Sequence, residues 1–267
     1  MILVAGGTGR LGTVVVRRLL DEGRAVRVLT RDAARAVHLS GVDVAVGDVR
    51  DAGTLPGAME GVTTVVSLVQ GFAGPGRVTP ESVDRDGNAH LVDAAAPTGA
   101  HVVLMSVLGA APDHPMELFR MKAAAESRLR GSGLPWTIVR AGAFLELYRE
   151  MLQRTSGRSG RPLVFGRGDN PIVFAAVDDV AEAVHRAVVD PAVRGTVLEV
   201  PGRTCTMNQL ASTLGTPGRP MRPRHVPRAV LRVLAAAGPT TPARMARAAL
   251  VMDSHPFADR GGEATAT

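Results

Sequence analysis

The sequence is poor in cysteine, lysine and aromatic residues. Its 267 residues contain one cysteine, Cys205, and aromatic side chains make up only 3% of the chain. A single cysteine excludes an internal disulfide framework and any metal site built from a cluster of cysteines, so we interpret Cys205 as an ordinary small residue. We therefore expect a reducing, cytoplasmic setting.

Long apolar runs are also missing. No stretch approaches the roughly 18–20 uninterrupted apolar residues that cross a membrane, so no membrane partner is expected. The apolar start, 1–5, has no basic region before it and is not expected to be a signal peptide. Hydrophobic residues still make up 45% of the chain, which is enough for the packed core of one large domain, or of a domain with a smaller lobe.

Positive charge comes almost entirely from arginine. The chain has 31 basic and 25 acidic residues, a net charge of +6, and Lys122 is its only lysine. Together with abundant alanine, glycine and valine, this bias is typical of genome composition rather than of a nucleic-acid footprint. Few aromatic side chains are available to stack on bases. We therefore expect no nucleic-acid partner.

Predicted strands and helices alternate through the first half of the chain. Strands are predicted at 1–6, 25–30, 42–46, 62–69, 101–106 and 136–140, and helices at 10–22, 33–39, 81–96 and 116–130. Several of the strands are apolar at consecutive positions, which indicates burial on both faces. The sequence therefore predicts an α/β fold in which a doubly wound, Rossmann-like parallel sheet is covered by helices on two sides.

The alternation loosens after about residue 150. Short strands are predicted at 163–165, 172–174 and 197–200, with helices at 180–189, 228–237 and 242–252 and a proline-rich linker at 215–227. This pattern predicts a smaller α/β lobe on the substrate side. The predicted division is a dinucleotide-binding core at 1–155, a lobe interwoven with that core at 156–253, and a flexible tail at 254–267.

A glycine-rich motif, Gly6-Gly7-Thr8-Gly9-Arg10-Leu11-Gly12, stands between the first predicted strand and the first predicted helix. A tight turn needs glycine at position 6, close approach of a diphosphate needs it at 9, and packing of the helix on the strand favours it at 12. The helix N-terminus then offers N–H groups and a partial positive charge to phosphate groups. The predicted cofactor-binding residues of this motif are Gly6, Thr8, Gly9, Arg10, Leu11 and Gly12.

The end of the second predicted strand indicates which dinucleotide binds. Enzymes that use NAD usually place an acid there to accept hydrogen bonds from the ribose, but this strand ends on Thr30 and Arg31. An arginine suits a 2′-phosphate through charge-assisted, forked contacts, and Arg10 could approach the same phosphate. Asp32 is interpreted as the cap of the following short helix. NADPH is therefore expected in preference to NADH.

Further cofactor contacts are expected where the third and fourth strands end. Asp48 and Val49 end the third strand and would border the adenine, although Asp48 could instead be a solvent-facing loop residue. Leu68 and Val69 end the fourth strand, and their backbone would run beneath the cofactor. The following loop, 71–76, would lie over the nicotinamide, which makes Phe72 a candidate substrate-binding residue.

These residues resemble the NmrA-like branch of the atypical short-chain dehydrogenases/reductases. Further segments that agree with this resemblance are 87–95, 101–109, 122–126, 132–140 and 177–181. Members of the branch include NADPH-dependent quinone reductases, isoflavone-type reductases and non-catalytic redox-sensing regulators. The resemblance covers most of 1–253 and implies a dinucleotide-binding fold, but it indicates no particular substrate.

The chain departs from the wider family at the catalytic residues. The family uses a Tyr-x-x-x-Lys pair, in which the tyrosine transfers a proton while the lysine lowers its pKa and holds the ribose. Lys122 matches the lysine, but Leu118 stands where the tyrosine would be, which excludes the tyrosine-based mechanism. Ser106 lies near the family's serine, and Asp84 stands where many relatives carry an asparagine. Glu126 follows Lys122 by one turn, where an ion pair could form.

Four residues are candidates for catalysis. As the only lysine, Lys122 indicates a need for a compact ammonium, which suits ribose hydroxyls. Ser106, His114 after the fifth strand, and Tyr148 after the sixth could each protonate a substrate, as could water. The predicted substrate-binding residues are Phe72, Phe144 and Tyr148. The histidines have no spacing typical of metal ligands, and no metal is expected.

Three functions remain open from the sequence. The first is an NADPH-dependent oxidoreductase that transfers hydride to a small apolar carbonyl, quinone or enone. The second is a non-catalytic NAD(P) sensor that binds a protein partner, for which the basic C-terminal helices offer a surface. The third is a cofactor-bound non-redox enzyme, such as a cyclase or epimerase. The sequence gives neither the substrate nor the oligomeric state, for which a homodimer is one option.

Overall fold

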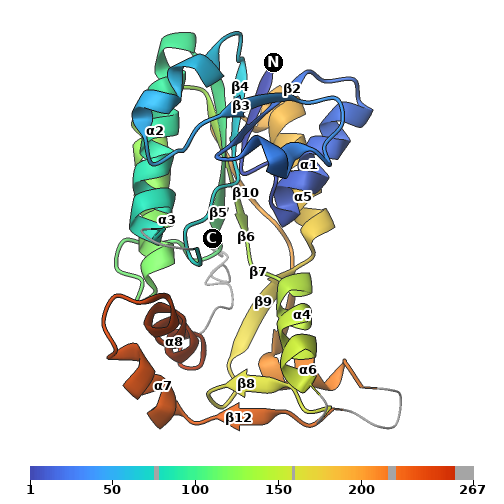
Figure 1. The fold of residues 1–267 in the computed structure, drawn as a ribbon, viewed down its shortest axis with the longest axis vertical. Helices are drawn as coiled ribbons and strands as arrows, with labels where there is room; N and C mark the ends of the chain where they lie inside the picture. The colour runs from blue at the N-terminus through green and yellow to red at the C-terminus, as the bar shows by residue number, and fades with distance from the viewer. Residues whose placement is uncertain (75–77, 158–159, 216–220, 256–267) are drawn as a thin grey trace, which may run out of the picture. The chain divides into compact units, whose positions relative to one another are not determined.

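The computed structural model describes residues 1–74, 78–157, 160–215 and 221–255 (Figure 1). The chain divides into two compact units. The core unit comprises Met1–Ala141 and Val177–Val200, and the C-terminal lobe comprises Gly142–Ala176 and Pro201–Thr267. Residue 155, the predicted boundary, lies inside helix α4 (Leu145–Ser156). Most of the predicted tail lies outside the described residues.

A seven-stranded parallel sheet forms the middle of the core unit. Its order is β10-β6-β5-β4-β1-β2-β3, and every pair of neighbours is parallel. Its strands are β1 (Ile2–Ala5), β2 (Val26–Thr30), β3 (Asp43–Val46), β4 (Thr64–Ser67), β5 (His101–Val107), β6 (Trp136–Ala141) and β10 (Val197–Glu199). The strand order reverses between β1 and β4, and ligands of open α/β sheets bind outside the carboxyl ends of the strands at such a switch point. The predicted fold class is confirmed.

Helices cover both faces of this sheet, with α1 and α5 on one side and α2 and α3 on the other (Figure 1). The helices are α1 (Arg10–Asp21), α2 (Asp86–Ala95), α3 (Glu117–Arg130) and α5 (Val177–Val189). Short turns of 3₁₀ helix lie between them: η1 (Ala33–Ala36), η2 (Ala52–Thr54), η3 (Pro56–Met59), η5 (Ala96–Thr98) and η7 (Pro191–Val193). A π-helical turn, η4 (Glu81–Arg85), runs directly into α2, and such turns are frequent at functional sites.

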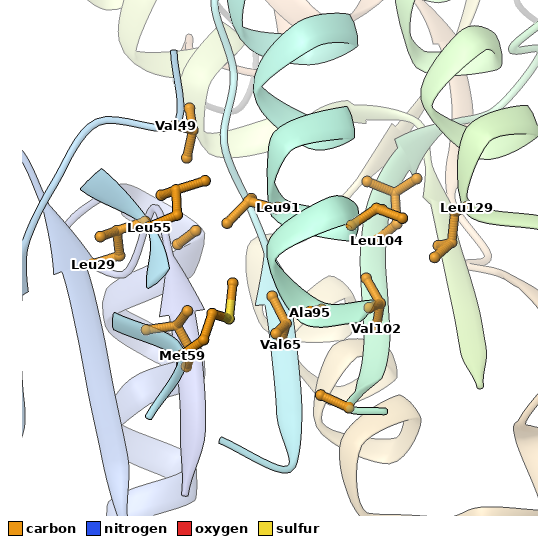
Figure 2. Packing of buried hydrophobic residues seen from close by; sticks show 14 of the residues in the cluster. Leu29, Val49, Leu55, Met59, Val65, Leu91, Ala95, Val102, Leu104 and Leu129 are labelled. Atoms are coloured by element: carbon orange, nitrogen blue, oxygen red, sulfur yellow. The ribbon is translucent and has the colours of Figure 1, made fainter. Parts of the chain in front are cut away.

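The hydrophobic core of this unit lies between the sheet and its helices. Figure 2 shows side chains from β4, β5 and α2 packing together, among them Val65, Leu91, Ala95, Val102 and Leu104. Val65 is fully buried, and Leu91 and Leu104 are no more than 2% exposed. Burying each such side chain contributes roughly 1.5–3 kcal/mol to folding. This packing holds the carboxyl ends of the central strands in place.

The C-terminal lobe is built from short elements. β11 (Arg203–Thr206) pairs antiparallel with β9 (Pro171–Ala175), which pairs parallel with β7 (Ala143–Phe144). β8 (Leu163–Phe165) and β12 (Arg224–Val226) form a second, parallel pair. The helices of the lobe are α4, α6 (Met207–Ser212), α7 (Arg228–Ala235) and α8 (Thr241–Met252).

One segment of the lobe was wrongly assigned from the sequence, and one helix was missed. Strand β12 lies inside 215–227, which was predicted as a linker because of its prolines, yet Pro223 and Pro227 only flank the strand. Helix α4 lies in a stretch for which no helix or strand was predicted. Its spacing of Leu145, Tyr148 and Leu152 is helical, so the signal was present in the sequence.

We expect buried His101 to make the core unit sensitive to acid. His101, at the start of β5, is 3% exposed, and its Nε2 lies 3.0 Å from Thr137 Oγ1 of β6. Burial lowers the pKa of His101 from 6.5 to about 4. Because the unfolded chain takes up this proton near its ordinary pKa, the free energy of unfolding should fall by about 3 kcal/mol as the pH drops from 6.5 to about 4.

Urea denaturation at a series of pH values measures this dependence. A His101→Gln variant, which has no titratable group at this position, should lose this part of the slope. If the variant and the original protein lose stability equally over the same pH range, other groups cause the acid sensitivity.

Candidate functional site

The glycine motif forms the turn from β1 into α1. Gly6 has a φ of +86°, and a Cβ atom there would lie 2.9 Å from the Leu68 backbone at the end of β4. A Cβ atom at Gly12 would overlap the carbonyl oxygen of Gly6. At Gly9, by contrast, the one described atom within 4 Å of an added Cβ would be the Gly6 oxygen, at 3.2 Å. Gly6 and Gly12 are therefore required by the fold, whereas Gly9 borders open space.

The N-terminus of α1 has the properties of an anion site. Gly9 is its N-cap, and among the described residues no side chain caps the helix and no acid stands in its first turn. The first N–H groups of a helix lack intrahelical partners and carry the positive end of the helix dipole. These residues fit a diphosphate, because the uncapped N–H groups can donate to it and glycine at position 9 leaves the space beside them open. Of the rest of the motif, Leu11 is buried, Thr8 is half-buried and Arg10 is exposed.

The end of β2 lies beside this turn, since β1 pairs with β2 over their full length. Arg31 follows the strand and is exposed. Asp32 Oδ1 accepts a hydrogen bond of 2.9 Å from the Ala34 N–H and so caps η1. The interpretation of Asp32 as a helix cap is confirmed. The Asp32 carboxylate at this strand end therefore caps η1, whereas the Arg31 guanidinium beside it is exposed.

Asp48 and Val49, the two cofactor contacts predicted after β3, have different surroundings. Asp48 forms an ion pair of 2.5 Å with Arg50, whose hydrogen bonds are the main reason that the pKa of the Asp48 carboxyl is lowered. Val49 is buried, and its carbonyl oxygen lies 2.8 Å from His90 Nδ1. The Asp48 carboxylate is therefore neutralised within its own loop.

Lys122 of α3 is buried among protein acceptors. Its Nζ donates to the carbonyl oxygens of Met105 (2.9 Å) and Val69 (3.1 Å) and lies 3.0 Å from Asp84 Oδ1. The side chain is 4% exposed. Two carbonyl oxygens thus accept hydrogen bonds from this ammonium, and the Asp84 carboxylate is its ion-pair partner. In this arrangement Lys122 is held by protein groups, whereas the family resemblance implied a ribose hydroxyl as its partner.

Asp84, in η4, is the ionic partner of this lysine. Its Oδ2 accepts a hydrogen bond of 2.8 Å from the Gly71 N–H, and the residue is fully buried. Burial raises the pKa of the Asp84 carboxyl, and the Lys122 ammonium and the Gly71 N–H oppose that rise. The buried pair thus ties α3 and η4 to the backbone at 69–71, directly after the Leu68 that packs on Gly6. We name Lys122 and Asp84, with the backbone groups they bind, the Lys122–Asp84 clamp.

Ser106 donates its hydroxyl proton to an acid in the interior. Its Oγ lies 2.6 Å from Glu126 Oε1, and Ser106 is 1% exposed. Glu126 also accepts two hydrogen bonds from Arg140, of 2.9 and 2.7 Å, and forms an ion pair with Arg130. The ion pair that the spacing allowed between Glu126 and Lys122 is therefore replaced by one with Arg140.

A second buried network joins β4 to α2. Ser67 Oγ donates to Asn88 Oδ1 at 2.5 Å, and Asn88 Nδ2 donates to the Asp84 carbonyl at 2.7 Å. Sequence reasoning missed Asn88 and the partners of Asp84, because these contacts join residues that are far apart in the sequence. The one sequence signal that pointed to this buried site was Lys122, the only lysine in a chain that is rich in arginine.

His114 and Phe72 lie on loops of the core unit. The ring of His114 stacks on Phe119 with ring centres 4.2 Å apart, and its Nδ1 accepts a hydrogen bond from the Met116 N–H at the start of α3. Phe72 is half-buried in the loop after β4. Residues 75–77 of the predicted loop over the nicotinamide lie outside the described residues.

Tyr148 and Phe144 belong to the C-terminal lobe. The Tyr148 hydroxyl lies 3.3 Å from Met252 Sδ, and its ring packs edge-on against Phe174 with centres 5.4 Å apart. Burial raises the pKa of the Tyr148 phenol to about 12. Phe144 is half-buried in β7, paired with Ala175. Tyr148 is thus half-buried and packs against the hydrophobic cluster of the lobe.

Comparison with known families shows the family to which the chain belongs. The NmrA-like family model matches residues 1–257. The chain belongs to the NmrA-like family. The resemblance inferred from the glycine motif and the later segments is thereby confirmed.

Named relatives of this NmrA-like chain differ in activity. An NAD(P)H azoreductase of Xenophilus azovorans is 32% identical over 230 residues, which cover 83% of this chain and 76% of that protein. The photosystem II assembly factor Ycf39 of a Synechocystis strain is 30% identical over 246 residues, covering 87% of this chain and 72% of that protein. Relatives therefore include both an enzyme and an assembly factor.

The fold is also shared with solved structures. The NADPH-dependent quinone oxidoreductase QOR2 of Escherichia coli, crystallised with NADPH, superposes with a TM-score of 0.78 at 23% identity, covering 98% of this chain and 92% of that one. At this identity the likeness shows the fold alone. In the described part of the NmrA-like chain, no helix is long and apolar enough to cross a membrane, and no group of three histidine, cysteine or acidic residues is placed to hold a metal ion.

Proposed function

We propose that this NmrA-like protein is an NADPH-dependent oxidoreductase that reduces a small, largely apolar carbonyl, quinone or enone. The observation that carries the proposal is the uncapped N-terminus of α1, reached past Gly9, at the switch point of the sheet. The azoreductase relative, which acts with NAD(P)H, supports the same class of chemistry.

The chain's own residues would bind and orient the cofactor. The N–H groups at the start of α1 would hold the diphosphate, and Arg31 would bind the 2′-phosphate. The Lys122–Asp84 clamp would fix the backbone at 69–71 beneath the dinucleotide. When bound, NADPH would supply a hydride to the substrate, which also takes up a proton to balance the reaction.

We infer that solvent water supplies this proton in preference to Ser106 or Tyr148. Leu118 replaces the tyrosine of the wider family and carries no proton to transfer. Ser106 directs its hydroxyl proton to Glu126, and the Tyr148 hydroxyl lies against Met252. A rate governed mainly by cofactor and substrate positioning is consistent with such a site.

A turnover assay tests this function. The protein is mixed with NADPH and a panel of quinones and enones, and the nicotinamide absorbance is followed. Loss of absorbance that depends on both the substrate and the protein supports the reductase. NADPH binding without turnover of any member of the panel would instead support a non-catalytic sensor, the alternative favoured by Leu118 at the tyrosine position and by the assembly-factor relative.

Replacing Arg31 with alanine should separate the two nicotinamide cofactors. We expect the Kd for NADPH to rise about 10–100-fold, because a charge-assisted contact to the 2′-phosphate is lost, while the Kd for NADH stays unchanged. Fluorescence titration with each cofactor measures both constants. Arg35→Ala, at another exposed arginine in the adjacent turn, is the matched control. An equal loss for NADPH and NADH would contradict the assignment of Arg31.

A further inference from the structure

Helix α7 of the C-terminal lobe turns an apolar surface to solvent. Val230, Val233 and Leu234 are 46%, 74% and 43% exposed, and their spacing places them on one side of the helix. Leu231, on the other side, is 1% exposed and anchors α7 in the lobe. The helix is therefore apolar on its outer as well as its inner side, which is unusual for a surface helix.

The neighbouring helix α8 packs against α7. α7 and α8 form a helical hairpin (Figure 1), and Arg247 of α8 donates a 2.7 Å hydrogen bond to the Ala235 carbonyl of α7. Met245 of α8 is 50% exposed. We call Val230, Val233 and Leu234 the α7 apolar face.

Positive charge is concentrated in the segment of the chain that contains α7. Residues 203–252 contain eight arginines and no acidic residue, so the remainder of a chain with a net charge of +6 has a slight negative balance. Arg222 and Arg224 lie just before and at the start of β12, Arg232 lies within α7, and all three are exposed. None of them takes part in the ion pairs formed among the described residues. Their charge is therefore available to an anionic partner.

The chemistry of this surface selects among partners. A second copy of the lobe would bring two acid-free basic segments together, which like-charge repulsion disfavours. Nucleic acid would be met by the arginines but would leave the α7 apolar face in water. An anionic bilayer satisfies both features, because apolar side chains enter the boundary between headgroups and acyl chains while guanidinium groups bind lipid phosphates.

We propose that the α7 apolar face, with Arg222, Arg224 and Arg232, binds the surface of an anionic lipid bilayer. Such peripheral binding needs no spanning segment. The expectation of no membrane partner rested on the lack of long apolar runs, and it therefore does not bear on this surface. The proposal is independent of the reductase function, because it uses residues outside the cofactor site.

Vesicle co-sedimentation of the full chain tests the proposal. The probes are vesicles of phosphatidylcholine mixed with phosphatidylglycerol, and vesicles of phosphatidylcholine alone. We expect binding to the anionic vesicles, weakened by salt and absent for the neutral ones. Val233→Asp should weaken that binding by about tenfold or more. Val37→Asp is the matched control, since Val37 is 79% exposed in the core unit and should leave binding unchanged.

Charge variants test the contribution of the arginines to vesicle binding. Arg224→Gln and Arg232→Gln should each weaken binding about fivefold. Because Val233 is exposed, its variant should keep its melting temperature and its turnover of a water-soluble quinone. Failure to bind anionic vesicles, an equal loss in Val37→Asp, or self-association abolished by Val233→Asp without vesicle binding would each overturn the proposal.

Discussion

Replacing Lys122 with methionine should lower the free energy of unfolding by about 3–5 kcal/mol. Methionine keeps the length of the apolar stem, so the loss comes from the Asp84 carboxylate, which is fully buried and would lose its ionic partner. The carbonyl oxygens of Met105 and Val69 lose a donor as well. Urea denaturation of the two proteins at neutral pH measures this difference.

A double variant separates a structural role of Lys122 from direct contact with the cofactor. Lys122→Met combined with Asp84→Asn removes both charges and keeps an acceptor for the Gly71 N–H. We expect this variant to recover most of the lost stability, because no unpaired charge remains in the interior. If the clamp acts by positioning the backbone at 69–71, the affinity for NADPH should recover with the stability.

Recovered stability without recovered NADPH affinity would contradict the claim that the Lys122–Asp84 clamp acts by positioning the backbone at 69–71. A double variant that is stable, yet binds NADPH about tenfold or more weakly than the original protein, would show that the Lys122 ammonium contacts the cofactor itself. Titration of NADPH into the single and double variants, at a temperature where each is folded, distinguishes the two results.

Valine substitutions at two glycines of the α1 turn should have different consequences. Gly9→Val should weaken NADPH binding at least about 100-fold, because the side chain displaces the diphosphate and two charge-assisted hydrogen bonds are lost. The fold should tolerate the change, since the described neighbour of an added Cβ is the Gly6 oxygen at 3.2 Å. Gly12→Val should instead destabilise the protein by about 3 kcal/mol or more, because its Cβ would overlap the Gly6 backbone.

Melting temperatures and cofactor titrations of the two variants measure this contrast. Gly9→Val is expected to melt close to the original protein and to bind poorly. Gly12→Val is expected to melt earlier, with weak binding that follows from the disturbed turn. A Gly9→Val protein that binds NADPH normally would mean that the diphosphate does not approach the helix at position 9.

The core unit could be predicted from local signals. Buried strands appear in the sequence as continuous apolar runs. The glycine spacing marks the turn into α1, because these glycines are needed for close contacts between nearby residues of the turn. The cap formed by Asp32 is likewise local, because its acceptor group lies two residues from the N–H that it binds. Such features depend on short stretches of chain and are therefore visible in one sequence.

The buried polar network could not be predicted in the same way. Lys122 meets Asp84 and Val69 across 38 and 53 positions of the chain, a pairing that depends on how α3, η4 and β4 pack. The family resemblance directed attention to ribose as the partner of Lys122, whereas the structure provides a carboxylate and two carbonyl groups. The same limit applies to Glu126, whose neighbour one turn away was expected as its partner but which binds Arg140 on another element.

The central claim is that the start of α1 binds the diphosphate of NADPH. Isothermal titration of NADPH into the original protein, beside an identical titration of Gly9→Val, tests it most directly. The account predicts saturable binding of one NADPH per chain by the original protein and at least about 100-fold weaker binding by a variant that is equally folded. A folded original protein that takes up no NADPH, or a variant that binds it equally well, would contradict the account.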